Sequence, residues 1–314
     1  LYRTNQTNFE KIPGSPIAYW ASPRIYNSFT NTIGQSIPVV AGISTGKNSK
    51  FIRYWYELQS NQRNGWVPFA KGGSFRKWFG NTDYRLWYSS DALEKMSKMN
   101  GFRHDGSKYY FETLISWSKI TSGRFSARIY YNSAFDSSAP AAITSSVAVL
   151  GFLNSIVTDY ILAMVNPTLN FPPGYISQLP SQPANPTIEK LVNENIDLWQ
   201  KDWNSFETSD HFDFCLIPWI AEHNRNWTVE AAFNQWKQEA QDRFDQLKKN
   251  EEELNKIFID LYGLQDELAP EESDKEVSVR KADLGRDIRA FMSYFIGVTF
   301  GRYSLDTPGL AFAG

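Results

Sequence analysis

The sequence predicts an α+β protein, with a basic mixed α/β part followed by a part built from long helices. Three observations support this prediction. Runs rich in aromatic and β-branched residues recur between turn signals in the first half of the 314 residues. A segment with six prolines in 21 residues follows, at 166–186. Apolar residues after it are spaced three and four apart, as in amphipathic helices. We therefore predict two domains, a basic one at 1–180 and a helical spacer domain at 181–314.

Four runs in the basic part predict strands. They are FIRYWYEL at 51–58, YRLWYSS at 84–90, KYYFETLISWS at 108–118 and ARIYYN at 127–132. Gly72–Gly73 and Asn81 separate the first runs. Asn100–Gly101 and Asp105–Gly106 are typical of hairpins, because tight hairpin turns need positive φ angles.

A single buried helix is expected over the apolar stretch VAVLGFLNSIVTDYILAMV at 147–165. The stretch approaches the length of a membrane span, but Asn154 and Asp159 near its middle are unfavourable in lipid. The proline density of 166–186 disfavours helix and predicts an extended linker.

Long helices are expected after the linker. Asn185 as N-cap and Pro186 at the first helical position begin one that extends to Trp203. A longer one begins near Thr228, and its nearly heptad apolar pattern predicts packing along a partner helix over about 50 Å, at roughly 1.5 Å rise per residue. Its apolar residues are Val229, Phe233, Trp236, Ala240, Phe244, Leu247, Leu254, Phe258 and Leu261.

The C-terminal part closes with a third expected helix at roughly 283–300. Its apolar face holds Leu284, Ile288, Phe291, Met292 and Phe295. The mostly charged span 266–281 is expected to be a loop. The carboxylate pairs Asp210/Asp213 and Glu251/Glu252 lie in acidic surroundings, where we expect solvated surface charge.

The formal net charge of −2 hides an uneven distribution. Residues 1–128 hold 18 Lys and Arg against 7 Asp and Glu, a balance of +11. Residues 187–314 hold 14 basic and 25 acidic residues, a balance of −11. A half this basic is expected where the partner is a polyanion such as DNA. The alternative is that the acidic half neutralises the basic half within the chain.

Cysteine and histidine usage limits the possible chemistry. The single cysteine, Cys215, excludes an internal disulfide framework and fits a reducing compartment, so we expect a cytoplasmic protein. His104, His211, His223 and that cysteine show no metal-ligand spacing, so no metal site is expected. The sequence begins at Leu1 without a secretion leader, and we expect it to be a piece of a longer protein.

The stretch FAKGGSFRKWFGN at 69–81 raises the possibility of a phosphate-binding loop. A nucleotide P-loop needs G-x-x-x-x-G-K-[ST], and this stretch lacks that pattern. STGKNSK at 44–50 also fails, because Asn48 stands where Ser or Thr should bind Mg²⁺. Glycines beside cations also suit close approach to a DNA backbone. The remaining alternative is a plain basic hairpin, and we assign Trp78 and Phe79 to the core.

Three basic clusters, at 44–53, 71–77 and 119–128, together favour nucleic acid over an ordinary polar surface. Arginine, lysine and small hydroxyl side chains can all donate to phosphate oxygens, and arginine can also read guanine. The candidate DNA-contacting residues are Thr45, Lys50, Arg53, Lys71, Arg76, Lys77, Lys119, Arg124 and Arg128.

Methyl transfer by this chain alone is not expected. A methyltransferase acting on an exocyclic amine needs a [DN]-P-P-[YF] loop, and the nearest match, at 166–169, is Asn-Pro-Thr-Leu. A glycine-rich loop for S-adenosylmethionine is also missing.

Several long segments nevertheless resemble the C-terminal part of adenine-specific DNA methyltransferases of the PglX type, from BREX phage-exclusion systems. These segments are FEKIPGSPIAYWAS (9–22), GISTGKNSKFIRYWYEL (42–58), FAKGGSFRKWFGN (69–81), ISWSKITSGRFSAR (115–128), LGFLNSIVTDYIL (150–162), NPTLNF (166–171) and DIRAFMSYFIGVTFGRYSLDTPGLAFAG (287–314). The resemblance covers nearly the whole chain. Thr45, Gly46, Asn48 and Phe51 also resemble the start of recognition domains in type I specificity subunits and type IIG restriction–modification enzymes.

The resemblance implies that this chain is a target-recognition domain plus a helical spacer, preceded by a catalytic domain that it lacks. It implies double-stranded DNA, that upstream methyltransferase domain and other defence-system proteins as partners, and no membrane. S-adenosylmethionine would be the cofactor of the missing domain, with none bound by this chain. One alternative is a protein-interaction scaffold of the same kind of system, acting through the long heptad-like helix. Another is carbohydrate binding through exposed tryptophans.

Overall fold

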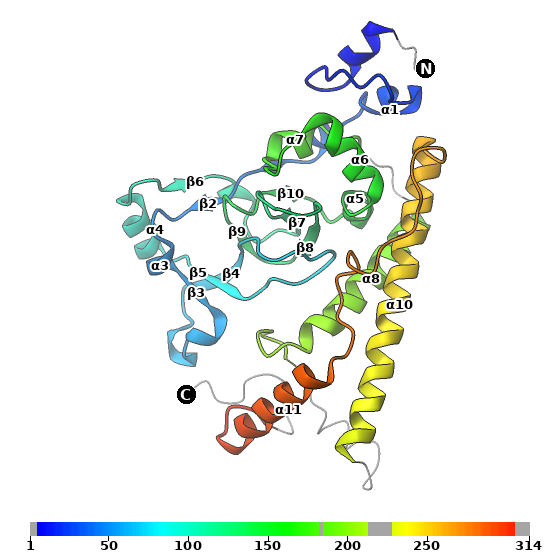
Figure 1. Ribbon diagram of the computed structural model, residues 1–314. Helices are drawn as coiled ribbons and strands as arrows, with labels where there is room; N and C mark the ends of the chain where they lie inside the picture. The colour runs from blue at the N-terminus through cyan, green and yellow to red at the C-terminus, as the bar shows by residue number, and fades with distance from the viewer. Residues whose placement is uncertain (1–4, 182–184, 213–227, 305–314) are drawn as a thin grey trace.

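The computed structural model describes residues 5–181, 185–212 and 228–304. Three small sheets with short helices form the N-terminal half, and long helices dominate the C-terminal part (Figure 1). The predicted α+β class is confirmed. Asp213, Cys215 and His223, which entered the sequence predictions, lie outside the described residues.

Short helical segments form the N-terminal end of the described chain. Ser22 caps one of them by accepting a hydrogen bond from the Ile25 backbone N at 3.3 Å, and Ile25 is buried in the core. The cap stabilises the start of this helix, and the burial of Ile25 attaches the segment to the core. The segments are η1 (Gln6–Lys11), α1 (Pro23–Ser28) and α2 (Ile33–Ser36).

The central sheet is antiparallel, with strand order β1–β10–β7–β8. Its strands are β1 (Val39–Val40), β10 (Ala141–Ile143), β7 (Leu114–Trp117) and β8 (Ala127–Tyr130). Every residue of β7, β8 and β10 is buried, which explains why their sequences show no simple alternation of polar and apolar residues. β7 and β8 confirm two of the predicted strands, in shorter form.

A second sheet has the order β3–β5–β4–β9, and a third consists of β2 and β6. Their strands are β3 (Ile52–Tyr54), β5 (Tyr84–Trp87), β4 (Trp66–Ala70), β9 (Ala134–Phe135), β2 (Ile43–Ser44) and β6 (Arg103–His104). Short helices connect them: α3 (Asn48–Phe51), η2 (Trp55–Glu57), η3 (Ser60–Gln62), α4 (Ser90–Ser97) and η4 (Ser107–Tyr109). β3 and β5 confirm the other two predicted strands. The hairpin prediction was wrong, because Gly101 and Gly106 have positive φ angles but neither lies in a turn that joins paired strands.

The apolar stretch 147–165 forms two helices instead of the single one we predicted. α5 (Val147–Leu153) ends at Asn154, Ser155 caps α6 (Ile156–Val165), and the two helices are bent by 66°. The Asn154 side chain turns away to bond the backbone N and O of Ala127, at 2.9 and 3.0 Å. Within the described residues no single helix is long and apolar enough to span a membrane. The bent pair of α5 and α6 meets both criteria only when its two helices are taken together.

The proline-rich segment is packed, so the extended linker that we predicted is wrong for its described part. It contains α7 (Pro173–Ser177), and both Phe171 and Ile176 are buried. The Phe171 backbone donates to Lys119 O at 2.6 Å, and its carbonyl accepts from Trp117 Nε1 at 2.8 Å. Prolines exclude long helix here, but they do not prevent close packing against a sheet.

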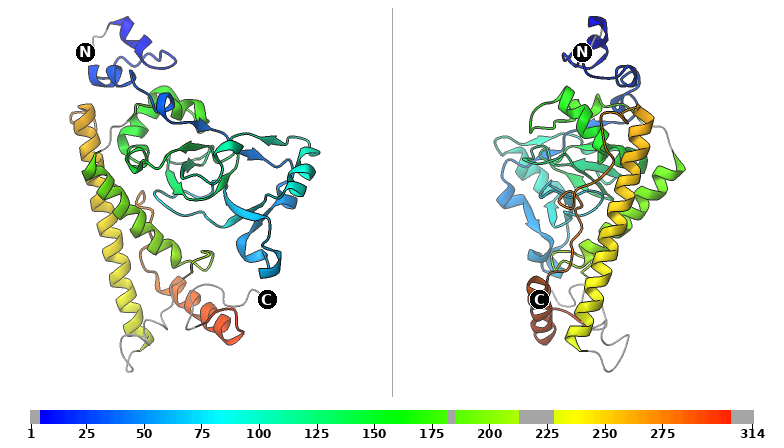
Figure 2. Two further views of the ribbon diagram at one scale, coloured as in Figure 1. Left: turned by 180° about the vertical axis from the view of Figure 1, so that it is seen from behind. Right: turned by 45° about the vertical axis from the view of Figure 1, so that its right-hand side comes forward.

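Among the described residues of the C-terminal part, three helices dominate: α8 (Pro186–Asn204), α10 (Val229–Tyr262) and α11 (Leu284–Thr299). Each begins where the sequence predicted, with a capping side chain from Asn185, Thr228 and Asp283, respectively. Figure 2 shows α10 running along one side of the molecule beside α8. The span between α10 and α11 contains neither helix nor strand, as predicted.

One hydrophobic core joins the two parts of the chain. It contains residues from the central sheet and α5 together with Val192 of α8 and Phe258 of α10. Gly151 of α5 allows close contact with α8, because a Cβ there would lie 2.8 Å from Val192 Cγ2. The boundary that we predict at residue 180 stays a prediction, but the parts on either side of it share this core.

Candidate nucleic-acid interface

Two of the three predicted basic clusters lie side by side. The Trp78 backbone N donates to Ala127 O at 3.0 Å, and the Ile129 N donates to Trp78 O at 2.9 Å. Ser118 Oγ donates to Gly73 O at 3.1 Å, where Gly73 has a φ angle of 128° that favours glycine. Trp78 is buried, as predicted. The segments 69–81 and 117–128 are therefore hydrogen-bonded to each other.

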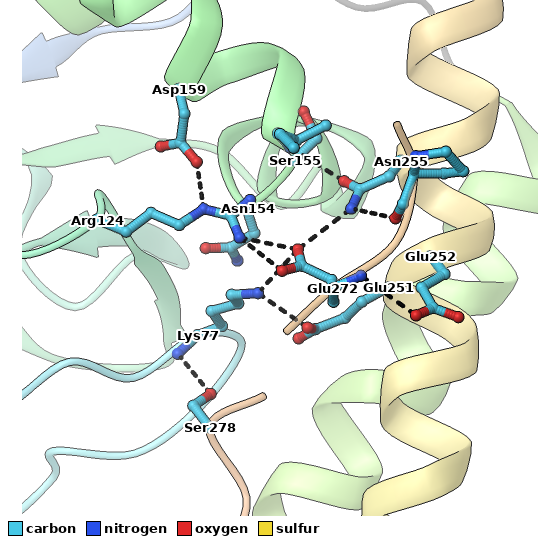
Figure 3. A network of polar contacts seen from close by, with 12 residues as sticks. Lys77, Arg124, Asn154, Ser155, Asp159, Glu251, Glu252, Asn255, Glu272 and Ser278 are labelled. Atoms are coloured by element: carbon cyan, nitrogen blue, oxygen red, sulfur yellow. Dashed lines mark hydrogen bonds and ion pairs between the residues drawn. The ribbon is translucent and has the colours of Figure 1, made fainter. Parts of the chain in front are cut away.

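Lys77 does not face solvent. Its side chain is 0% exposed, and its Nζ lies 2.8 Å from Glu251 Oε2 on α10 and 3.3 Å from Glu272 Oε1 (Figure 3). Trp78 Nε1 donates to the other oxygen of Glu251 at 2.6 Å. Our prediction that Glu251 is solvated charge was wrong, because its side chain is only 2% exposed.

Arg124 belongs to the same buried cluster. Its Nη1 lies 2.7 Å from Glu272 Oε2, and its Nε donates to Asp159 of α6. Asn255 Nδ2 donates to Glu272 Oε1 at 3.2 Å, while Asn255 Oδ1 accepts from the Ile156 backbone at 3.0 Å. Figure 3 shows Glu272 between the cations of the two basic loops.

This cluster holds three carboxyl groups against two cations. Burial raises the pKa of Asp159 to about 6, against the opposing effect of Arg124. Burial also raises the pKa of Glu251, against the effect of Lys77. Burial acts on Glu272 in the same direction, but Lys77 and Arg124 outweigh it and lower its pKa. Glu272 is therefore the carboxylate that holds its negative charge most firmly.

Arg128 and Arg76 are also engaged within the chain. Arg128 is buried and donates to Arg76 O at 3.2 Å and to Ser118 Oγ at 3.3 Å, linking the two loops. The Arg76 guanidinium lies over the rings of Trp203 at 4.6 Å and Trp199 at 5.3 Å, both on α8. Burial lowers its pKa, partly offset by acidic groups, of which Asp202 acts most strongly.

Thr45 has a structural role in the third cluster. It is fully buried, its Oγ1 donates to Asn48 Oδ1 at 2.7 Å, and it accepts from the Lys47 backbone at 3.2 Å. Gly46 follows with a φ angle of 70°, and a Cβ there would lie 2.7 Å from Asn100 O. This turn leads into α3, which carries the exposed Lys50.

Six of the nine predicted contact residues are exposed or partly exposed, and two of these, Arg76 and Arg124, are held by the aromatic rings and carboxylates described above. Lys50 is exposed, and Arg53, Lys71 and Lys119 are partly exposed. Ser138 connects two of them, because its Oγ donates to Lys71 O at 3.3 Å and its carbonyl accepts from the Lys119 N at 2.9 Å. We call Lys50, Arg53, Lys71 and Lys119 the cationic strip. Whether any of the nine residues contacts DNA is not tested by the structure and stays a prediction.

Three tyrosines beside the cationic strip were missed by the sequence analysis. Tyr54, Tyr56 and Tyr84 bring their rings together at the β3–β5 edge. Lys71 Nζ lies 6.0 Å from the ring centre of Tyr84. The predicted strand at 51–58 put Tyr54 and Tyr56 on one face, which was a usable signal, although the structure ends β3 at Tyr54 and places Tyr56 in η2.

Comparison with known proteins finds no family model that matches the chain. The chain is 46% identical to an adenine-specific methyltransferase, PglX, of Lacticaseibacillus casei (strain Zhang), and the alignment covers 100% of the chain and 28% of that protein. It is 30% identical to an adenine-specific methyltransferase, BrxX, of Escherichia coli O9:H4 (strain HS), with 99% and 28% covered. The chain thus spans less than a third of the length of these curated relatives.

Among solved structures, the type IIL restriction-modification enzyme MmeI in complex with DNA is similar to the chain. The superposition covers 86% of this chain and 37% of that one, at 11% sequence identity and a TM-score of 0.46.

Proposed function

We propose that this chain, which is homologous over its whole length to one region of the PglX-type adenine-specific methyltransferases, is the DNA sequence-recognition region of such an enzyme. The resemblance to that family is confirmed by these relatives. The recognition role is our proposal. The observation that carries it is the cationic strip. Lys71 and Lys119 lie on the two loops that Ser118 and Ser138 join by hydrogen bonds, and Lys50 and Arg53 lie on α3 and β3.

The strip supplies the phosphate contacts in this proposal. Lys50 is exposed and Lys119 is partly exposed. Lys71 Nζ lies 3.9 Å from Asp136 Oδ2, and Arg53 Nη1 donates to the carbonyls of Ser49 and Ile52, so these two cations would contact phosphate through their remaining N–H groups. Contact of each side chain with a phosphate of the DNA would release condensed counterions. It would also position the duplex so that other residues could contact the base edges.

Lys77, Arg124 and Arg128 have a supporting role in the same proposal. Freeing Lys77 for DNA would leave Glu251 buried without its cation, at a cost of about 3–5 kcal/mol. Arg124 and Arg128 likewise bond groups of their own chain. They hold the two loops in position, and of the cationic strip Lys71 also takes part in the charge balance within the chain, because its Nζ lies 3.9 Å from Asp136 Oδ2.

Catalysis belongs to another region of the parent protein in this proposal. That region would bind S-adenosylmethionine and transfer the methyl group to adenine, while this chain selects the site. Double-stranded DNA and the methyltransferase domain are the partners that the proposal requires.

The scaffold alternative must use a surface other than the predicted seam of α10. Leu247, Leu254 and Phe258 of that seam are buried within the chain, in the core shared with α5 and α8. α11 instead exposes an apolar face, with Leu284, Met292, Phe295 and Ile296 each more than half exposed. The occupant that fits it is another region of the same parent protein, since most of the length of the relatives lies outside this chain.

Binding of a fluorescein-labelled mixed-sequence duplex, followed by fluorescence anisotropy, tests the recognition proposal. The affinity should fall steeply between roughly 50 and 200 mM salt, with a slope of about 0.9 per phosphate contacted. Undetectable binding at low salt, or binding indifferent to salt, would contradict the proposal.

A further inference from the structure

Three tyrosine rings form a row at the edge of the β3–β5 sheet. Tyr54 contacts both others: its ring centre lies 5.2 Å from that of Tyr56, with 4° between the planes, and 4.7 Å from that of Tyr84, with 28°. The hydroxyls of Tyr54 and Tyr84 are 3.1 Å apart. We call these residues the tyrosine row.

Sheet stability explains only part of this row. Tyr54 and Tyr84 are a directly opposed cross-strand pair, a contact that stabilises many sheets. Tyr56 lies past the end of β3, in η2, and contributes no strand pairing there. It is nevertheless 44% exposed, more than the 36% of Tyr54. Aromatic rings held parallel at a surface form a flat apolar platform that a planar ligand can cover.

The charges around the row differ at its two ends. At the Tyr84 end, Lys71 Nζ lies 6.0 Å from the ring centre. At the Tyr56 end, Glu57 is an additional acidic group, and its Oε2 accepts from the Tyr54 backbone at 2.8 Å, whereas Asp83 acts on both Tyr56 and Tyr84. A phosphate therefore fits the Tyr84 end, whereas the Tyr56 end suits an uncharged flat group.

We propose that the tyrosine row binds an unpaired base of DNA, which stacks on Tyr56 while a phosphate farther along the same strand contacts Lys71. A nucleobase is planar and uncharged, and its strand carries a phosphate at every nucleotide, so a strand that runs along the row matches both ends. This inference rests on the proposed recognition of DNA and goes beyond it, because a fully paired duplex offers no base face to a side chain. The inference therefore predicts that this chain binds DNA with an unpaired base more tightly than fully paired DNA.

A duplex that carries one bulged 2-aminopurine tests the inference against the fully paired duplex of otherwise identical sequence. The wild-type chain should bind the bulged duplex more tightly and quench the 2-aminopurine fluorescence. Tyr56→Ala should weaken binding of the bulged duplex by roughly 5- to 150-fold, the range expected for loss of one base–aromatic stack, with little change for the paired duplex. Tyr56→Phe keeps the ring and should bind like the wild type.

Tyr175→Ala is the matched control, because Tyr175 is 37% exposed on α7, outside the tyrosine row. Equal affinity of the wild type and Tyr56→Ala for the bulged duplex, alongside salt-dependent binding of the paired duplex, would overturn the inference and leave the recognition proposal standing. If the wild type bound neither duplex, both the inference and the recognition proposal would be wrong. If a soluble oligosaccharide quenched the tyrosine fluorescence while the bulge brought no gain in affinity, the row would be a sugar platform and the inference wrong.

Discussion

Lys77 Nζ lies 2.8 Å from Glu251 Oε2, and this contact joins the basic loop 69–81 to the middle of α10. Both side chains are almost completely buried, so removing the cation leaves a carboxylate without compensation. Lys77→Met should therefore lower the free energy of unfolding by about 3–5 kcal/mol, measured by urea denaturation.

Two further variants separate this contact from ordinary surface charge. Combining Lys77→Met with Glu251→Gln should recover most of the loss, because the buried charge is removed together with its partner. Lys190→Met removes a lysine that is 76% exposed and 3.9 Å from Glu194, and it should cost less than about 1 kcal/mol. If Lys77→Met were as mild as Lys190→Met, the buried contact would contribute little to stability.

The cationic strip makes a separate prediction about salt. Replacing Lys71 and Lys119 by glutamine removes two charges and keeps side chains of similar length. The slope of log affinity for duplex DNA against log salt should fall by about 2, roughly 1 for each phosphate that is no longer neutralised. The control is Lys190→Gln on α8, outside the strip, which should leave the slope unchanged. An unchanged slope in the double variant would show that Lys71 and Lys119 do not contact phosphates, and that DNA binds at another surface.

Local features of this fold were predictable because they depend on neighbours in sequence. Thr228 begins α10 by accepting a hydrogen bond from the Ala231 backbone at 3.1 Å, and Asp283 begins α11 in the same way from Arg286 at 2.7 Å. Such caps involve residues three positions apart, so a short window contains the whole signal. The break at Asn154 was missed because its hydrogen-bond partner, Ala127, is 27 positions away.

Contacts between residues distant in sequence also explain why the exposed and the buried cations of the site could not be told apart in advance. Lys71 and Lys77 are six positions apart in one basic loop, and nothing local distinguishes them. Lys77 is buried because Glu251, 174 positions away, lies opposite it. The regional charges of +11 and −11 indicated that such pairing could occur, but they could not identify which cations it would use.

Asp83 gives the protein a pH dependence whose sign can be worked out. Burial raises its pKa to about 6, against the opposing charge of Arg76, and its Oδ1 is buried without a hydrogen-bond partner among the described residues. Because the folded-state pKa lies above the unfolded value, this group favours folding at low pH, and the contribution is lost as the pH rises through 6. Asp83→Asn should remove that loss.

Urea denaturation at several pH values measures the effect as a difference between the wild type and Asp83→Asn. Between about pH 4 and pH 7 the wild type should lose about 1–3 kcal/mol relative to the variant, allowing for partial solvent access. Asp91→Asn is a suitable control, since Asp91 lies on α4 with its side chain 59% exposed. A wild-type curve parallel to that of Asp83→Asn would show that Asp83 titrates near its ordinary value.

Leu254 and Leu261 lie on the same helix, α10, and both were assigned to its predicted heptad-like seam. Leu254 is 1% exposed in the core, whereas Leu261 is 50% exposed. Leu254→Ala should therefore cost about 2–5 kcal/mol, because it removes buried side-chain packing and leaves a cavity. Leu261→Ala should stay within about 0.5 kcal/mol. If the seam at Leu254 were instead open to a separate protein partner, the two variants would unfold at similar urea concentrations and differ only in partner binding.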